Sequence, residues 1–213
     1  MYTEIRQDII NAALEIKAYG LIALSGGNVS VRLDDGTILV TPSGMSYEGM
    51  KPEDILHIKP CGEIIEGTLR PSVDTVALLY IYEHMPHVNA IIHTHQPYAS
   101  AIGLIQDEFP VACTTLANVT LGSVPVAPYS SAASVQMGME TVAHIGDRRA
   151  VILKHHGVVT VGETLKQALY AAIYMEEAAK CYLAAKAAGE VKLMTPEQAA
   201  EAVETFKDYG QKK

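Results

Sequence analysis

Two short histidine motifs are the groups in this sequence whose residue types and spacing best suit chemistry. The first is HTH at 93–95, which follows the apolar run Ile91-Ile92, and the second is HHG at 155–157, which follows the apolar run 150–153. If 93–95 ends a strand, His93 and His95 point to the same face, because side chains in a strand repeat every second residue. Two imidazoles on one face can bind a single cation.

A third ligand would complete such a site, because zinc sites that keep a position open for water or substrate commonly use three protein ligands. The HHG motif is the strongest source, since it also sets histidine beside glycine at the end of an apolar strand. Taken separately, each motif is also compatible with ordinary surface histidines, and HHG alone is the weaker indication of a ligand. The remaining histidines belong to no such motif and are interpreted as surface residues: His57, His84, His87 and His144.

Asp74 and three polar loops are further candidates. Asp74 comes just after Pro71-Ser72, at the start of a predicted helix. The helix dipole alone favours a carboxylate there, although a carboxylate near a metal could instead move a proton or bind the ion. The loops SGGN at 25–28, TPSG at 41–44 and PS at 71–72 could direct backbone N–H groups at an anion. Glycine pairs also mark plain turns.

Hydrophobic periodicity predicts the elements that position these motifs. Helices are expected over residues 3–19, 75–83, 97–105, 131–145 and 163–188, with a last one from Pro196 to about Phe206. Short strands are expected after the first glycine-rich loop, within 52–66 around a Cys61-Gly62 turn, and at TILVT, NAIIH, SVPVAPY and both sides of HHG. This pattern favours a largely antiparallel sheet flanked by helices. Residues 1–213 show no repeat or linker and are expected to form one domain.

Composition argues against several classes of partner. The 16 Lys and Arg against 24 Asp and Glu give a formal net charge of −8, and without a basic run no nucleic-acid binding is expected. No apolar stretch approaches the roughly 18–20 residues of a membrane span. Cys61, Cys113 and Cys181 are too few and too far apart for a disulfide framework or a thiolate metal site. With no visible signal peptide, the chain is expected to be cytoplasmic.

Seven motifs, in order, resemble the class II aldolase/adducin-type family over essentially the whole chain: SGGNVSVR, TPSG, EGTLRPSVDT, NAIIHTHQPYA, VPVAPY, KHHGVV and FKDYGQ. The resemblance implies an α/β fold of the α+β three-layer type, with a central, mostly antiparallel sheet between helical layers. It also implies a homotetramer of four-fold symmetry with active sites at subunit interfaces. Its metal would be Zn²⁺, with Mn²⁺ or Co²⁺ as competitors, held by His93, His95 and His156.

The same resemblance assigns roles to the remaining site residues. Asp74 would handle the proton at the carbon of the enediolate that the metal, as a Lewis acid, stabilises. Tyr209, supplied near a subunit interface, would exchange a proton with the aldehyde oxygen; without the resemblance it reads as a tail residue. The residues that would bind the substrate phosphate are Gly27, Asn28, Ser43, Gly44 and Ser72.

The implied reaction is cleavage of a ketose 1-phosphate, such as L-fuculose 1-phosphate, to dihydroxyacetone phosphate and a small aldehyde. Three positions depart from the family pattern: Val73 replaces a phosphate-binding serine, and Thr114 replaces a tyrosine of the aldolases. The third is Asn118, which replaces an acid of the epimerases. The alternative function is an L-ribulose-5-phosphate 4-epimerase: the pair Asp74-Thr75 favours it, and Asn118 counts against it. A non-catalytic adducin-type binding domain is a further alternative, against which the intact histidine set argues.

Overall fold

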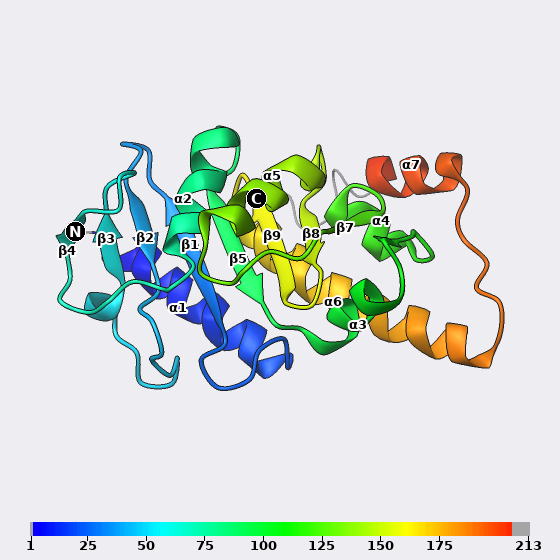
Figure 1. Cartoon of the computed structure of the whole chain (residues 1–213), viewed down its shortest axis with the longest axis horizontal. Coiled ribbons are helices and arrows are strands. Elements are labelled where there is room, and N and C mark those ends of the chain that lie inside the picture. Colours follow the sequence, from blue (N-terminus) through cyan, green and yellow to red (C-terminus); the bar gives the residue numbers. More distant parts are fainter. Residues whose placement is uncertain (1, 206–213) are drawn as a thin grey trace.

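One sheet runs through the computed structural model, which describes residues 2–205 (Figure 1). Its nine strands lie side by side in the order β4-β3-β2-β1-β5-β9-β8-β7-β6. The strands are β1 (Gly27–Arg32), β2 (Ile38–Val40), β3 (Leu56–Ile58), β4 (Ile64–Glu66), β5 (Ala90–Thr94), β6 (Glu108–Phe109), β7 (Val124–Ala127), β8 (Ala150–Leu153) and β9 (Gly157–Gly162).

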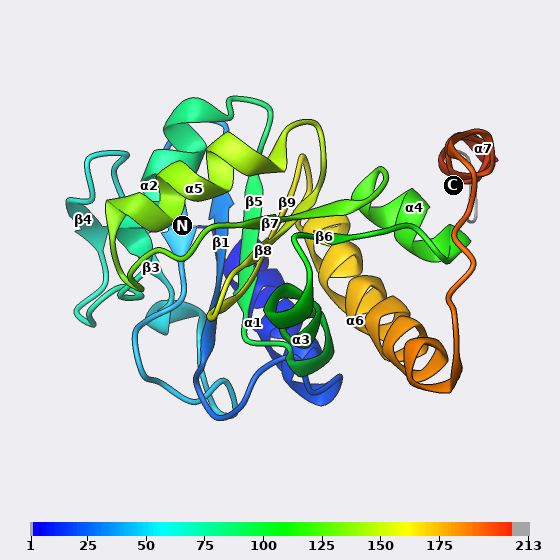
Figure 2. The ribbon, with the colours of Figure 1, turned by 45° about the vertical axis from the view of Figure 1, so that its right-hand side comes forward.

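Helices cover both faces of this sheet (Figure 2). On one face α1 and α6 share a buried core with β1 and β5, and α3 packs on α6. On the other face α2 and α5 share a core with β2, β3, β5, β8 and β9. The helices are α1 (Thr3–Ala18), α2 (Thr75–His84), α3 (Pro97–Ile105), α4 (Thr114–Thr120), α5 (Val135–Ile145), α6 (Leu165–Ala188), α7 (Pro196–Thr205) and the short 3₁₀-helix η1 (Pro52–Asp54).

All neighbouring strands pair antiparallel except β7 and β8, which are parallel. Parallel neighbours need a crossover connection, and α5 supplies it between these two strands. The prediction of a mostly antiparallel sheet between helical layers is therefore confirmed. Every helix in the described range is too short or too polar to cross a membrane.

Strand β5 at the middle of the sheet sets the direction of the first histidine. Ala90 and Ile92 point into the core beneath α1 and α6, whereas Ile91 points into the core beneath α2 and α5. This alternation follows from the two-residue repeat of an extended chain. His93 therefore faces the side of α2. The sequence pattern predicted the strand but not which helical layer this face meets.

The structure adds α4 and β6, which the sequence pattern did not predict. The α4 segment TTLANVT contains mostly weak helix formers, and its N-terminus has no side-chain cap. Leu116 nevertheless packs in a core with Met175 and Ala178 of α6. Tertiary burial therefore overrides a poor local propensity in this helix.

Two other expectations need correction. The helix expected from residue 131 begins at Val135, because the Ser134 side chain caps it by accepting from the Met137 N–H, and residues 128–134 form a loop. His57 is not a surface residue: it is buried, and its Nε2 lies 2.7 Å from Thr37 Oγ1. The last predicted helix corresponds to α7, and its expected end at Phe206 lies outside the described residues.

Candidate active site

The two histidine motifs meet in space. Ligand nitrogens of His93, His95 and His156 all lie within 4.8 Å of one another. The ring centroids are 4.9 Å apart for His93 and His95, 4.8 Å for His93 and His156, and 5.1 Å for His95 and His156. His93 and His95 come from the end of β5, and His156 comes from the turn between β8 and β9. His155 of the HHG motif is exposed.

Close backbone packing brings the turn to the strand end. Strand β5 pairs with β9, and Thr94 lies opposite Val158. A Cβ on Gly157 would stand only 2.3 Å from the Thr94 carbonyl oxygen, so only glycine permits this approach. On the other side, a Cβ on Gly26 would stand 3.2 Å from His95 Nδ1. A glycine of the HHG motif and a glycine of the SGGN loop therefore make room for the histidine cluster.

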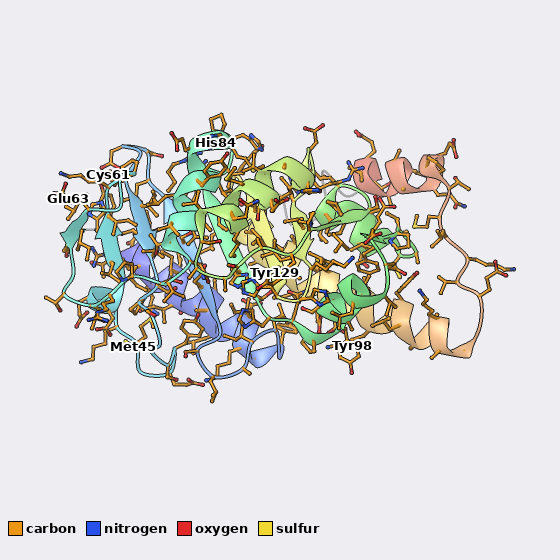
Figure 3. All side chains as sticks on the ribbon, viewed as in Figure 1. Met45, Cys61, Glu63, His84, Tyr98 and Tyr129 are labelled. Carbon is orange, nitrogen blue, oxygen red and sulfur yellow. The ribbon has the colours of Figure 1, made fainter. Side chains whose placement is uncertain are left out.

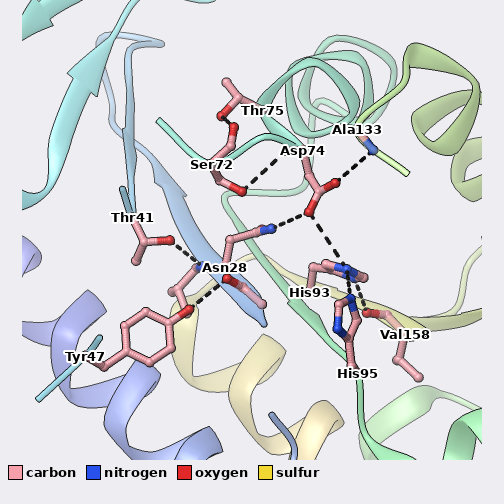
Figure 4. Close-up of polar contacts among 12 residues, drawn as sticks. Asn28, Thr41, Tyr47, Ser72, Asp74, Thr75, His93, His95, Ala133 and Val158 are labelled. Atoms are coloured by element: carbon pink, nitrogen blue, oxygen red, sulfur yellow. Dashed lines mark hydrogen bonds and ion pairs between the residues drawn. The ribbon is translucent and has the colours of Figure 1, made fainter. Parts of the chain in front are cut away.

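Hydrogen bonding fixes the tautomer of His93. Its Nδ1 lies 2.9 Å from the Val158 carbonyl oxygen, which can only accept, so Nδ1 carries the proton and Nε2 presents a lone pair to the cluster. His95 Nε2 lies 3.1 Å from His93 Nε2 (Figure 4). The buried Nδ1 of His156 has no hydrogen-bond partner among the described residues. An inward lone pair and an orphaned nitrogen fit a bound divalent cation.

Burial keeps these imidazoles neutral. It lowers the pKa of His93 to about 4, against the opposing attraction of the Asp74 carboxylate and with a contribution from the two other histidines. Burial also lowers the pKa of His95 and of His156. Because a metal competes with protons for imidazole nitrogen, neutral histidines at physiological pH are prepared to bind one.

The carboxylate of Asp74 points at this cluster and does not cap α2. Asp74 occupies the N-cap position of α2, but its side chain makes no capping bond. Instead Oδ2 accepts from Asn28 Nδ2 at 3.0 Å, and Oδ1 accepts from the Ala133 N–H at 3.1 Å. Oδ2 also lies 3.9 Å from His93 Nε2. The simple helix-terminus interpretation therefore does not account for its geometry (Figure 4).

The three polar loops converge beside Asp74. The Ser72 N–H donates to the Thr41 carbonyl at 3.1 Å, which joins the second loop to the third. Thr41 Oγ1 in turn accepts from the Val29 N–H at 3.2 Å, which joins the second loop to β1. Of the predicted phosphate ligands, Asn28 and Ser72 are buried, Gly27 is half-buried, and Ser43 and Gly44 are exposed. The side chain of Val73 is 63% exposed.

Thr114 and Asn118 lie elsewhere. Both belong to α4, which packs on α6 and α7, near strand β7, three positions along the sheet from β5. Thr114 lines a separate cavity of about 430 Å³ between α4 and α7. No described contact joins this region to the three histidines. Tyr209, the second predicted catalytic residue, lies outside the described residues.

Sequence reasoning missed the loop 128–134. Ala133 has a left-handed backbone with φ of 54°, and its N–H contacts Asp74. Ser130 in the same loop is buried, and its Oγ has no partner among the described residues. Tyr129 is exposed with its ring centroid 6.4 Å from that of His155, and Figure 3 shows it near the middle of this view of the molecule. The run SSAAS at 130–134 could have indicated a loop, but most of it was assigned to the helix expected from residue 131.

The sequence also matches a known family. The model of the class II aldolase and adducin N-terminal domain matches residues 7–183. The chain belongs to this class II aldolase/adducin family. Its expected identity as an enzyme of the lyase class is confirmed, since named relatives and structural neighbours are aldolases.

Curated relatives and a solved structure extend this likeness over nearly the whole chain. A 5-deoxy-D-ribulose 1-phosphate aldolase of Bacillus thuringiensis serovar kurstaki is 32% identical, and the alignment covers 97% of both chains. An L-fuculose phosphate aldolase of Haemophilus influenzae is 33% identical, with 97% of this chain and 95% of that protein covered. The solved structure of an L-fuculose 1-phosphate aldolase superposes with a TM-score of 0.91 at 27% identity, covering 97% of this chain and 98% of the other.

Proposed function

We propose that this class II aldolase-family protein cleaves a ketose 1-phosphate into dihydroxyacetone phosphate and a small aldehyde, with a divalent metal ion as cofactor. The observation that carries the proposal is the cluster of three neutral imidazoles with a buried carboxylate 3.9 Å from His93. Both kinds of named relative act on phosphorylated ketoses, which supports the substrate class. L-Fuculose 1-phosphate is the first candidate substrate.

The ion would be held by His93, His95 and His156, and Zn²⁺ is the proposed metal, with Mn²⁺ and Co²⁺ as competitors. A divalent ion in this place supplies Lewis-acid stabilisation to substrate oxygens next to the bond that breaks. The bond from His93 Nδ1 to the Val158 carbonyl orients that ligand, as outer hydrogen bonds commonly do in metal sites.

Asp74 is proposed to move the proton at the carbon that becomes free when the C3–C4 bond breaks. Asn28 and Ala133 donate to its two oxygens and hold the carboxylate in one direction. A carboxylate so fixed, beside the cation site, supports a role in general acid–base catalysis. Tyr209 is proposed to exchange a proton with the aldehyde oxygen, in line with its place in the family motif.

The converging loops are proposed to bind the substrate phosphate. The half-buried loop at Gly27 and Asn28 lies beside the buried Ser72, and backbone N–H groups in such loops bind anions well. Ser43 and Gly44 would close the exposed side of this pocket. Val73 offers no hydroxyl, so the pocket would use one side-chain donor fewer than the family pattern.

Assembly is part of the proposal. Thr114 and Asn118 lie on α4, away from the histidines of their own chain, and we propose that this region faces the site of a neighbouring copy in a homotetramer. All three cysteines are free thiols, which supports a reducing, cytoplasmic location. Light scattering on the purified protein would test the tetramer directly.

Product analysis tests the function. After the metal content is measured, the enzyme is given L-fuculose 1-phosphate and, separately, 5-deoxy-D-ribulose 1-phosphate. Dihydroxyacetone phosphate with lactaldehyde from the first, or with acetaldehyde from the second, supports the proposal and identifies the preferred sugar. L-Ribulose 5-phosphate is the third substrate: its conversion to D-xylulose 5-phosphate, with no cleavage of the others, would establish the epimerase instead. A protein without metal or turnover would favour the adducin-type binding domain.

A further inference from the structure

Glu176 of α6 is a buried carboxylate without a cationic partner among the described ion pairs. Only 1% of the residue is exposed, and the nearby Lys180 pairs with Glu177 at 2.6 Å. An unpaired buried carboxylate is costly unless strong hydrogen bonds satisfy it. Its two oxygens accept from the Tyr98 and Ala99 N–H groups, each at 3.0 Å. These donors belong to the first turn of α3, where the helix dipole also favours an anion.

The segment that Glu176 contacts begins directly after a histidine of the candidate metal site. Strand β5 ends at Thr94 and α3 begins at Pro97, so His95 lies in the short link between them. His93, by contrast, is inside the strand and bonded to the Val158 carbonyl. The His95 side chain contacts His93 through its Nε2, on the side of the candidate metal site. The position of His95 therefore depends on how the two ends of its link are anchored.

A second contact anchors the same link to the same helix. Gln96 Nε2 donates to the Ala172 carbonyl at 3.4 Å, and Gln96 Oε1 accepts from Thr94 Oγ1 at 2.7 Å. Ala172 lies one helical turn before Glu176 in α6. Helix α6 thus binds the chain immediately after His95 at two successive turns. Figure 3 shows Tyr98 with its side chain directed outward, where Lys180 Nζ of α6 lies 5.8 Å from the ring centroid.

We propose that Glu176 is a positioning residue for His95: by anchoring the first turn of α3 to α6, it fixes the link that presents this imidazole to the metal ion. The inference rests on the proposed function, in which the histidines bind a divalent cation. A purely structural helix cap would contribute to stability alone. A positioning role would in addition set the metal affinity and the ligand geometry of the folded protein.

The test is Glu176→Gln in the full chain, with Co²⁺ as the probe metal. Glutamine keeps the size of the side chain but replaces one acceptor by an NH₂ group, which cannot accept from an α3 N–H. Glu177→Gln is the matched control, because it makes the same change at the next, exposed residue. We expect a folded protein whose Kd for Co²⁺ rises by about tenfold, as found for outer-shell contacts in metal sites, with an altered visible Co²⁺ spectrum. The control should keep both properties of the wild type.

The outcomes separate this inference from the proposed function. Wild-type affinity and spectrum in folded Glu176→Gln would overturn the positioning role and leave the aldolase proposal intact. A wild-type protein that fails to bind Co²⁺ would overturn both. If Glu176→Gln does not fold, Gln96→Met provides the measurement, because it breaks the other anchor of the link; an unchanged Co²⁺ Kd and spectrum in that variant would equally overturn the role.

Discussion

Acidification should destabilise the metal-free protein through His93 in a defined pH window. The side chain is completely buried at 0% exposure, and burial lowers the pKa of His93 from 6.5 to about 4. As the pH falls below about 6.5, the unfolded chain binds a proton at this residue, whereas the folded protein does not do so until about pH 4. The unfolded state therefore binds more protons in this window, and the free energy of unfolding decreases as the pH falls.

The size of the effect follows from the two pKa values. A gap from 6.5 to about 4, at about 1.4 kcal/mol per pH unit, corresponds to about 3 kcal/mol lost across the window. That is a large share of the roughly 5–15 kcal/mol that stabilises a typical domain. The contribution is fully present above pH 6.5 and is gone once the folded protein also binds the proton.

Urea unfolding in the presence of EDTA, from pH 7 to pH 4, measures this quantity for the wild type and for His93→Gln. Carboxylates common to both proteins cancel in the difference, so the wild-type advantage should shrink by about 3 kcal/mol on acidification. His87→Gln is the control, because it makes the same change at an exposed histidine; its difference from the wild type should stay constant over this range. A constant difference between wild type and His93→Gln over the whole range would refute the burial argument.

Three further results are expected. Asp74→Asn should keep its metal, because the carboxylate is 3.9 Å from His93 and not needed as a ligand. Its kcat should nevertheless fall about 100-fold or more, because an amide cannot carry the proton. Full activity of this variant would exclude Asp74 as the residue that moves the proton. Gly157→Ala should lower the free energy of unfolding in urea by about 1–3 kcal/mol, since its methyl would stand 2.3 Å from the Thr94 carbonyl oxygen. Gly189→Ala is the control and should not lower it, because open space surrounds Gly189. Tyr209→Phe should lower kcat but leave inhibition by dihydroxyacetone phosphate nearly unchanged; equal loss of both would contradict its place at the aldehyde.

Local pattern was sufficient for much of the fold. The alternation in 90–94 predicted strand β5 and the common face of His93 and His95, because the two-residue repeat is a property of any extended chain. Helical periodicity predicted α1, α2, α3 and α6 within a few residues. It failed at α4, whose helix is stabilised by the burial of Leu116 against α6. The surface interpretation of His57 was also wrong, since this residue lies between Leu56 and Ile58 in the buried strand β3.

The sequence by itself determined which side chains could do chemistry and, through short periods, which way neighbours such as His93 and His95 point. The HHG motif and the family resemblance also offered His156 as a third ligand, but only the tertiary structure brings it beside them, since this requires β5 to pair with β9 across more than 60 residues of chain. It also decided that Asp74 turns to Asn28 and Ala133 instead of capping its helix, and that Glu176 reaches the link beyond His95. These contacts depend on strand register and on close packing of distant segments, which no local propensity encodes.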